Sequence, residues 1–129
     1  MADRAFTNVL CTDLPKSVAF YTALLGLTEH FTSDWFVILT DPDRPGFELG
    51  LLTQTSPITP AQALGPAQGV LLTFVVADCD QAHRKATELG ADVLEPPQDM
   101  FYGQRRMILR DPDGVLLDIS APTAPAPGA

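Results

Sequence analysis

The chain repeats one order of secondary structure, and this duplication limits its possible folds more than any other feature. Strand-forming residues 5–12 lead into a helix that begins at Asp13, carries a proline in its first turn and ends at Gly26. Residues 70–77 lead in the same way into a helix that begins after Asp78. Short strand-like runs separated by turn residues follow both helices. Each half of the chain is therefore predicted to form βαβββ.

Both helices carry signals for their ends and for a buried face. Asp78 with Gln81 three residues later is a capping pair, and Gly90 closes the second helix as Gly26 closes the first. Apolar residues at helical spacing predict the faces that are buried. These residues are Leu14, Val18, Tyr21 and Leu25 in the first helix, and Ala82, Ala86 and Leu89 in the second.

The duplication extends to single residues. A DPD turn starts at Asp41, seven positions before Glu48, and another starts at Asp111, seven positions before Asp118. The spacing predicts that the two acids hold equivalent places in their modules. Each lies in an otherwise apolar strand, and alternation directs it to the opposite face from its immediate neighbours. We expect these faces to be concave, so that each acid lines a cavity.

The module boundaries follow from changes in composition. The first module is predicted over residues 1–53 and the second over 69–121, within one structural domain. Residues 54–68 contain three prolines and little strand pattern, which indicates a connector with one helical turn after Pro60. Residues 122–129 are rich in proline and alanine and are expected to form a flexible tail.

Composition excludes several classes of function. Sixteen acids against eight bases give a net charge of −8, which repels nucleic acid. No apolar run is long enough to span a membrane, and the first ten residues lack a signal-peptide pattern, so we expect a cytoplasmic protein with no membrane partner. Motifs for serine hydrolases, P-loop proteins, dinucleotide binding and zinc proteases are missing from the sequence.

The cysteines and most of the bases have structural explanations. Cys11 and Cys79 are far apart and lack a CxxC neighbourhood, which argues against a zinc site or a disulfide framework. Cys11 is expected to be a small core residue rather than a nucleophile. Arg105, Arg106 and Arg110 lie beside acids and are expected to form a solvated surface.

The order of elements and several motifs resemble the vicinal oxygen chelate superfamily, which includes glyoxalases, bleomycin-resistance proteins and extradiol dioxygenases. The resemblance covers about residues 5–121 and is carried by DLPKSVAFYTALLGL in the first half and YGQRRMILRDPDGVLLDIS near the end. It implies an α+β fold of two tandem βαβββ modules whose curved mixed sheets surround a shared cavity. It also implies a homodimer, in which cavities are built from modules of both chains.

The resemblance implies a metal site that this chain retains only in part. In metal-dependent members, a histidine in the first strand of each module and an acid in the last strand of each bind the metal. Glu48 and Asp118 occupy the ligand-like acid positions, whereas Phe6 and Leu71 replace the histidines. We therefore expect no metal and no other cofactor, although two carboxylates can hold a hard divalent cation weakly.

The two histidines of the chain do not supply the missing ligands. His30 ends a predicted strand, and His83 lies on the second helix next to a core-facing position. Both are expected to be partly exposed residues rather than ligands.

The predicted cavity wall is mainly apolar and supplies the candidate ligand contacts. Trp35 and Tyr102 are the preferred stacking pair, with ordinary packing as the alternative for each aromatic residue. Gln104 and Arg106 can donate to ligand oxygens, and a cross-strand salt bridge is the alternative for Arg106. The candidate ligand-binding residues are Glu48, Asp118, Trp35, Tyr102, Gln104, Arg106, Asn8, Phe6 and Leu71.

Two functions from different classes fit these observations. The first is metal-independent binding or sequestration of a hydrophobic or aromatic small molecule, of the antibiotic-resistance type, with no catalytic residue assigned. The second is a metal-dependent lyase, isomerase or dioxygenase of the same superfamily that uses Glu48, Asp118 and further ligands. The lost histidines favour binding, and the retained acids keep the enzyme as the alternative.

Overall fold

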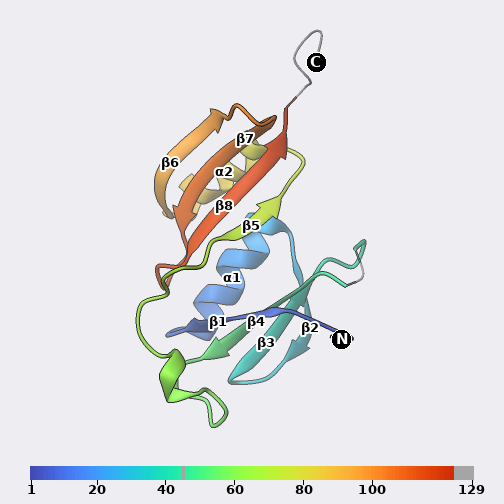
Figure 1. Cartoon of the computed structure of the whole chain (residues 1–129). Coiled ribbons are helices and arrows are strands. Elements are labelled where there is room, and N and C mark those ends of the chain that lie inside the picture. Colours follow the sequence, from blue (N-terminus) through green and yellow to red (C-terminus); the bar gives the residue numbers. More distant parts are fainter. Residues whose placement is uncertain (45, 124–129) are drawn as a thin grey trace. The chain divides into compact units, whose positions relative to one another are not determined.

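A computed structural model of the chain describes residues 1–44 and 46–123. The chain divides into two compact units, Met1–Pro66 (unit 1) and Ala67–Ala129 (unit 2), and each is described by itself. Both units follow the predicted βαβββ order (Figure 1). Within the described residues, no helix is long and apolar enough to cross a lipid bilayer.

Unit 1 packs one helix against a four-stranded mixed sheet. The sheet order is β1-β4-β3-β2, with β1 parallel to β4 and the other neighbours antiparallel. The helix contacts β3 and β4, and Leu39, Leu49 and Leu51 on these strands are buried beneath it. Its elements are β1 (Thr7–Cys11), α1 (Leu14–Leu25), β2 (Thr28–Thr32), β3 (Phe36–Thr40), β4 (Glu48–Thr53) and the 3₁₀ helix η1 (Ala61–Ala63).

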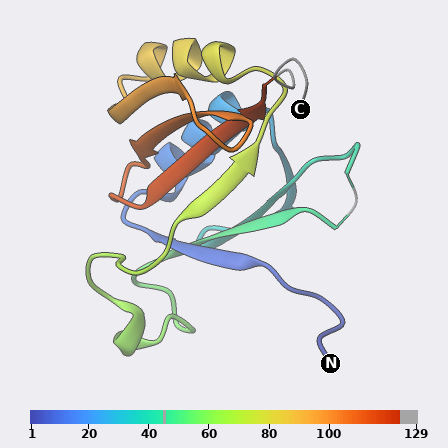
Figure 2. The same cartoon turned by 45° about the horizontal axis from the view of Figure 1, so that its top comes forward.

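Unit 2 repeats this architecture with the sheet order β5-β8-β7-β6. Figure 2 shows α2 running across one face of this sheet, and Met107, Leu109 and Leu117 are fully buried. Its elements are β5 (Leu72–Val75), α2 (Cys79–Glu88), β6 (Asp92–Asp99), β7 (Gln104–Arg110) and β8 (Leu116–Pro122).

The predicted helix signals are confirmed. The Asp13 side chain accepts a hydrogen bond from the Lys16 backbone N–H, and Asp78 accepts one from Gln81 in the same way. Gly26 takes the left-handed conformation (φ 68°) that lets it cap α1, a conformation that costs other residues more. The predicted helical turn after Pro60 is η1.

The predicted helix faces are partly wrong. Leu14 and Tyr21 are buried as expected, whereas Val18 is only half-buried. The α1 residues that complete the buried face are Ser17, Phe20 and Leu24. On α2, Ala82 and Ala86 are buried, but Leu89 lies beyond the last helical residue and is exposed. A search for apolar residues at helical spacing missed Ser17, because a small hydroxyl residue can also occupy the buried face of a helix.

Two predicted boundaries also shift. The strand expected over residues 91–96 continues as β6 to Asp99 through two prolines, which an edge strand tolerates because one side of its backbone needs no ladder partner. The tail expected over 122–129 begins inside β8, which ends at Pro122. The part of that tail from residue 124 lies outside the described residues.

The hairpins before β4 and β8 differ in length, which shifts the two modules out of register. Thr40 pairs with Glu48 in unit 1, whereas Arg110 pairs with Leu116 in unit 2. The connection in unit 1 is therefore two residues longer. Because side chains alternate with a period of two, this difference keeps Glu48 on the expected face but moves it along the strand.

The register therefore corrects the predicted equivalence of the two acids. The matching residues across three strands are Asn8, Gly50 and Ile38 in unit 1, and Thr73, Asp118 and Ile108 in unit 2. Asn8 and Thr73 each lie five residues before a helix N-cap, so they are equivalent. Glycine, not Glu48, occupies the place of Asp118 in unit 1. The shared DPD spacing predicted the wrong equivalence because the connection between the paired strands is two residues longer in unit 1.

Candidate functional site

Glu48 lies on the face of the unit 1 sheet opposite α1, here called the helix-free face. Alternation along β4 places Leu49 under the helix and Glu48 on the other side. Arg4, on the segment before β1, pairs with this carboxylate through two hydrogen bonds. One joins Arg4 Nε to Glu48 Oε2 at 2.8 Å, and the other joins Nη2 to Oε1. This two-point geometry is the strongest way to pair a guanidinium with a carboxylate.

The Arg4 guanidinium also lies over the Phe6 ring, with its central carbon 5.0 Å from the ring centroid. Arg4 and Phe6 are two residues apart, and the contact between them places both beside Glu48 on the helix-free face. The guanidinium thus meets the electron-rich ring face and the carboxylate together. A phenyl ring, a cation and an acid form one cluster at the position where the resemblance implied a histidine.

Electrostatics follow this geometry. Hydrogen bonding from Arg4 is the main cause that lowers the pKa of Glu48 below its ordinary value of 4.5, with help from the charges of Arg4 and His30 and against the effect of burial. The same hydrogen bond raises the pKa of Arg4. Glu48 is therefore ionised at neutral pH, which makes it a poor proton donor or general base there.

A cavity of about 510 Å³ opens beside this ion pair. Besides Arg4 and Glu48, its walls include His30 from β2, Thr40 from β3 and Asp41 from the hairpin, all in unit 1. His30 is exposed, as expected, and lies at a β-bulge in β2. The volume falls within the range of small-molecule sites, and six of the nine lining residues carry polar or charged side chains.

Gly50 leaves room for the Asn8 side chain on the helix-free face. A Cβ atom at Gly50 would stand 2.0 Å from Asn8 Oδ1 and 3.2 Å from a ring carbon of Phe36. The Asn8 and Phe36 side chains therefore fill the space that a side chain at Gly50 would need. Trp35 stacks on Phe36 with ring centroids 6.0 Å apart and remains partly exposed. Asn8, Phe6, Glu48 and Trp35 thus belong to one unit.

Asp118 is held differently. It is 8% exposed and accepts hydrogen bonds from Ser120 Oγ at 2.6 Å and Thr73 Oγ1 at 3.0 Å. Thr73 is its direct neighbour on β5 in the observed register, whereas Leu71 lies before the strand begins and is half-exposed. Both Asp118 oxygens therefore have hydroxyl donors, and no cation of the described part of the chain pairs with this acid.

The remaining candidates from unit 2 lie on β7 or just before it. Arg106 is 3.8 Å from Glu95, the cross-strand salt bridge expected as the alternative to a ligand contact. Gln104 keeps its side-chain carbonyl oxygen buried without a hydrogen-bond partner among the described residues, so its contact with a ligand stays a prediction. Tyr102 is half-exposed and packs edge-to-face against Phe101 at 5.3 Å. Trp35 and Tyr102 belong to different units, so their pairing stays a prediction.

Arg105 and Arg110 of unit 2 are also paired with acids. Arg105 donates to Asp80 and Asp99, which raises its pKa, and Arg110 lies 3.6 Å from Asp92. Arg110 is exposed as expected, whereas Arg105 is half-buried.

Both cysteines are buried residues with carbonyl partners. Cys11 Sγ lies 3.5 Å from the Leu52 carbonyl oxygen, and Cys79 Sγ lies 3.4 Å from that of Ile119. Burial raises the pKa of the Cys79 thiol. The expected core role of Cys11 is confirmed, and Cys79 is held as an unreactive thiol.

The residues at the implied metal positions do not fit a divalent metal. Arg4 engages both oxygens of Glu48, and hydroxyl groups engage both oxygens of Asp118. Phe6 and Leu71 offer no donor atoms. Among the described residues, no three His, Cys, Asp or Glu side chains form a group that could hold a metal ion.

Comparison with known proteins agrees with this architecture. A model of the Glyoxalase/Bleomycin resistance protein/Dioxygenase superfamily matches residues 5–119. The chain belongs to this superfamily. No curated protein matches the sequence significantly.

Solved structures with the same fold come from several bacteria. A glyoxalase/bleomycin resistance protein/dioxygenase family enzyme from Burkholderia phytofirmans PsJN superposes with a TM-score of 0.80 at 23% identity, over 93% of this chain and 98% of its own. TioX from Micromonospora sp. ML1 gives 0.71 at 21% identity, over 93% and 98%. Protein ATC0852 from Agrobacterium tumefaciens gives 0.74 at 26% identity, over 96% and 100%. These similarities show the shared fold.

Sequence reasoning missed Arg4 as part of the site. Its signal was present, because Arg4, Phe6 and Asn8 alternate along one extended segment and share a face. Alternation along β8 places Ser120 on the same face as Asp118, but the hydrogen bond from Thr73 depends on the register between β5 and β8. No sequence pattern identifies which hydroxyl faces the acid across a parallel pair.

Proposed function

We propose that this superfamily member binds a hydrophobic or aromatic small molecule without a metal ion, in the manner of sequestering, antibiotic-resistance-type proteins. The observation that carries the proposal is the Arg4–Glu48 pair over Phe6. A cation from the chain itself neutralises the acid, and an aromatic ring takes the place of an imidazole. These groups suit ligand binding better than metal catalysis.

The chemistry of the cluster suggests how a ligand is held. Arg4 uses Nε and one terminal nitrogen for Glu48, and a guanidinium carries five N–H donors, so others can bind ligand oxygens. The Arg4 side chain is 56% exposed and can adjust to a ligand, while Glu48 fixes its charged end. Phe6, Phe36 and Trp35 offer ring faces for stacking.

The cellular setting belongs to the same proposal. We propose a cytoplasmic homodimer that acts on a small molecule and not on nucleic acid. The net charge of −8 supports the exclusion of nucleic acid. Sedimentation with and without the bound compound tests the dimer.

Two measurements on one preparation test the function. Metal analysis of protein purified without chelators is expected to find no stoichiometric metal. A thermal-shift screen against aromatic natural products and divalent metals is expected to respond to the former, because a ligand that binds only the folded state raises the melting temperature. Stoichiometric metal, or a shift with one metal alone, would overturn the proposal in favour of the metal-dependent enzyme.

A substitution then tests the site. Glu48→Gln removes the charge that positions Arg4, so we expect weaker binding of any compound found in the screen, with folding retained. Glu88→Gln on α2 removes the same charge from an exposed position in unit 2 and is the matched control. Equal affinities for the wild type and Glu48→Gln would mean that the acid plays no part in binding.

A further inference from the structure

A second cavity lies on the opposite side of the unit 1 sheet from Glu48. It is an open groove of about 720 Å³ between α1 and β2, and every residue that lines it belongs to unit 1. Val37, whose partner on β4 is Leu51, forms part of its floor, which places the groove on the helix-covered face. Its size is typical of a small-molecule site.

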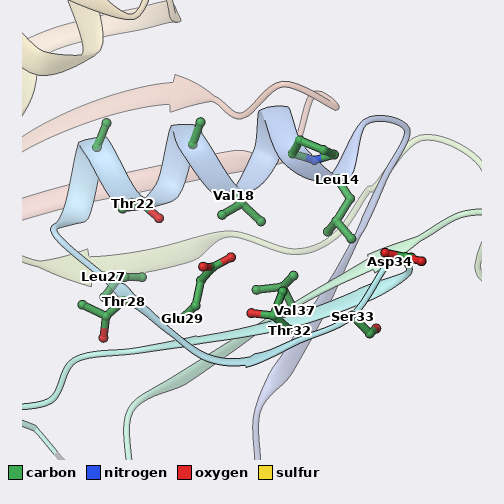
Figure 3. A pocket seen from close by; sticks show the side chains of 13 residues that line it. Leu14, Val18, Thr22, Leu27, Thr28, Glu29, Thr32, Ser33, Asp34 and Val37 are labelled. Carbon is green, nitrogen blue, oxygen red and sulfur yellow. The ribbon is translucent and has the colours of Figure 1, made fainter.

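The walls of this α1–β2 groove are mainly apolar. Val18 and Thr22 face it from α1, and Leu27 contributes from the turn after the helix (Figure 3). Val18 is only half-buried because its side of α1 lies over the groove instead of the sheet core. The groove thus explains why the predicted buried stripe of α1 was displaced.

One carboxylate points into this apolar space. Glu29 pairs with Leu39 across the β2–β3 ladder, and Leu39 is a fully buried residue of the helix-covered face. Figure 3 shows the Glu29 side chain directed from β2 toward α1. The next residue, His30, lines the cavity on the other face, as strand alternation requires. No side chain among the described residues forms an ion pair with Glu29.

The charges in the groove have one sign. Asp34 lines its mouth, and no lysine, arginine or histidine is among the lining residues. A ligand that fills the apolar walls leaves the Glu29 carboxylate partly desolvated, and a cationic group on that ligand offsets this cost. A carboxylate on the ligand would be repelled.

We propose that the α1–β2 groove is a second ligand site, for an organic amine whose apolar body lies along α1 and whose ammonium group pairs with Glu29. The site is distinct from the Arg4–Glu48 cluster because the sheet separates them. It does not depend on the proposed function of that cluster, and either site can fail without the other.

Three probes with one apolar body and different charges test the proposal on the full chain. Amide chemical-shift changes are followed by NMR during titration with phenylbutylamine, phenylbutanol and phenylbutyrate. We expect phenylbutylamine to shift the amides of residues 18–22 and 28–32 in a saturable way. Its affinity should exceed that of phenylbutanol by about two- to fivefold, the contribution of a partly exposed charge pair, and phenylbutyrate should bind weakest.

Two substitutions separate the charge from the shape of the groove. Glu29→Gln should make the amine and the alcohol bind equally, whereas Glu88→Gln should leave their difference unchanged. Val18→Phe fills the groove and should weaken both probes, which keeps the test informative if one variant folds poorly.

Several results would overturn the proposal. These are no saturable shifts at millimolar amine, shifts centred on the helix-free face, or equal affinity of the amine and the alcohol in the wild type. The plainer role of an inward acid on an edge strand is to prevent pairing with another chain. Self-association of Glu29→Gln with unchanged amine preference would establish that role and exclude the amine site.

Discussion

The two units follow one pattern but hold their acids by different means. Glu48 is paired with Arg4, a long side chain on the segment before β1, whereas Asp118 is held by the short hydroxyls of Thr73 and Ser120. The Arg4 side chain is exposed to solvent, whereas Asp118 is buried. In unit 1 the cation itself stays in contact with solvent while it pairs with the acid, whereas in unit 2 both donors are short side chains fixed by the sheet.

The hairpin before each strand accounts for much of this difference. The hairpin of unit 1 is two residues longer, so Gly50 takes the place that Asp118 has in unit 2. Glu48 is then the first residue of β4, where Arg4 can reach it. A change in loop length thus altered which chemistry each module can support. The comparison yields three predictions on stability.

The largest effect is expected at Gly50, the unit 1 counterpart of Asp118. Gly50→Ala places a Cβ atom against Asn8 Oδ1 and close to Phe36. Asn8 must rotate away and Phe36 must yield, which should lower the free energy of unfolding by about 1–3 kcal/mol, the usual cost of overpacking. Urea denaturation measures this change.

A compensating substitution identifies the cause. Asn8→Gly alone empties the space, and in the double variant the cost of Gly50→Ala should be smaller than in the wild-type background. If the two costs simply add, the clash with Asn8 is not what requires glycine here.

A smaller effect is expected at Thr73. Thr73→Val keeps the shape of the side chain but removes the donor to Asp118, which retains Ser120. The cost should be about 1 kcal/mol, near the lower end for an unpaired buried acceptor, because Thr73 is exposed and water can replace its hydroxyl. Thr87→Val on α2 removes a hydroxyl that donates to the His83 carbonyl of the same helix and is the control. Equal losses in both variants would deny Asp118 any special dependence on Thr73.

The smallest effect, and the one that depends on pH, is expected at Arg4. Arg4→Ala should be less stable than the wild type at pH 7, because the pair lowers the pKa of Glu48 in the folded state. A depressed pKa contributes stability that is complete above the unfolded value, near 4.5, and is lost as pH falls through the folded value. The difference between wild type and variant should therefore shrink below about pH 4.5 and with added salt.

Thermal unfolding across pH measures this difference. Arg84→Ala removes the same charge from α2, where Arg84 has no ion pair among the described residues, and should show no such dependence on pH. A stability difference for Arg4→Ala that persists unchanged in acid would mean that Glu48 is not its source.

The sequence by itself determined the order of elements, the helix ends and the class of fold. Asp13, Asp78 and Gly26 act through contacts within a few residues, so local chemistry was enough to find them. The alternation along β4 also predicted correctly that Glu48 lies opposite Leu49. The family followed from the same local signals taken in order.

Only the tertiary structure decided the register, and with it the neighbours of each acid. Whether Asp118 corresponds to Glu48 or to Gly50 depends on where a hairpin closes, and a two-residue change leaves the alternating pattern intact. The partners Arg4 and Thr73 are more than 40 residues from their acids along the chain. Contacts at that separation arise from strand pairing and loop length together, which no single segment encodes.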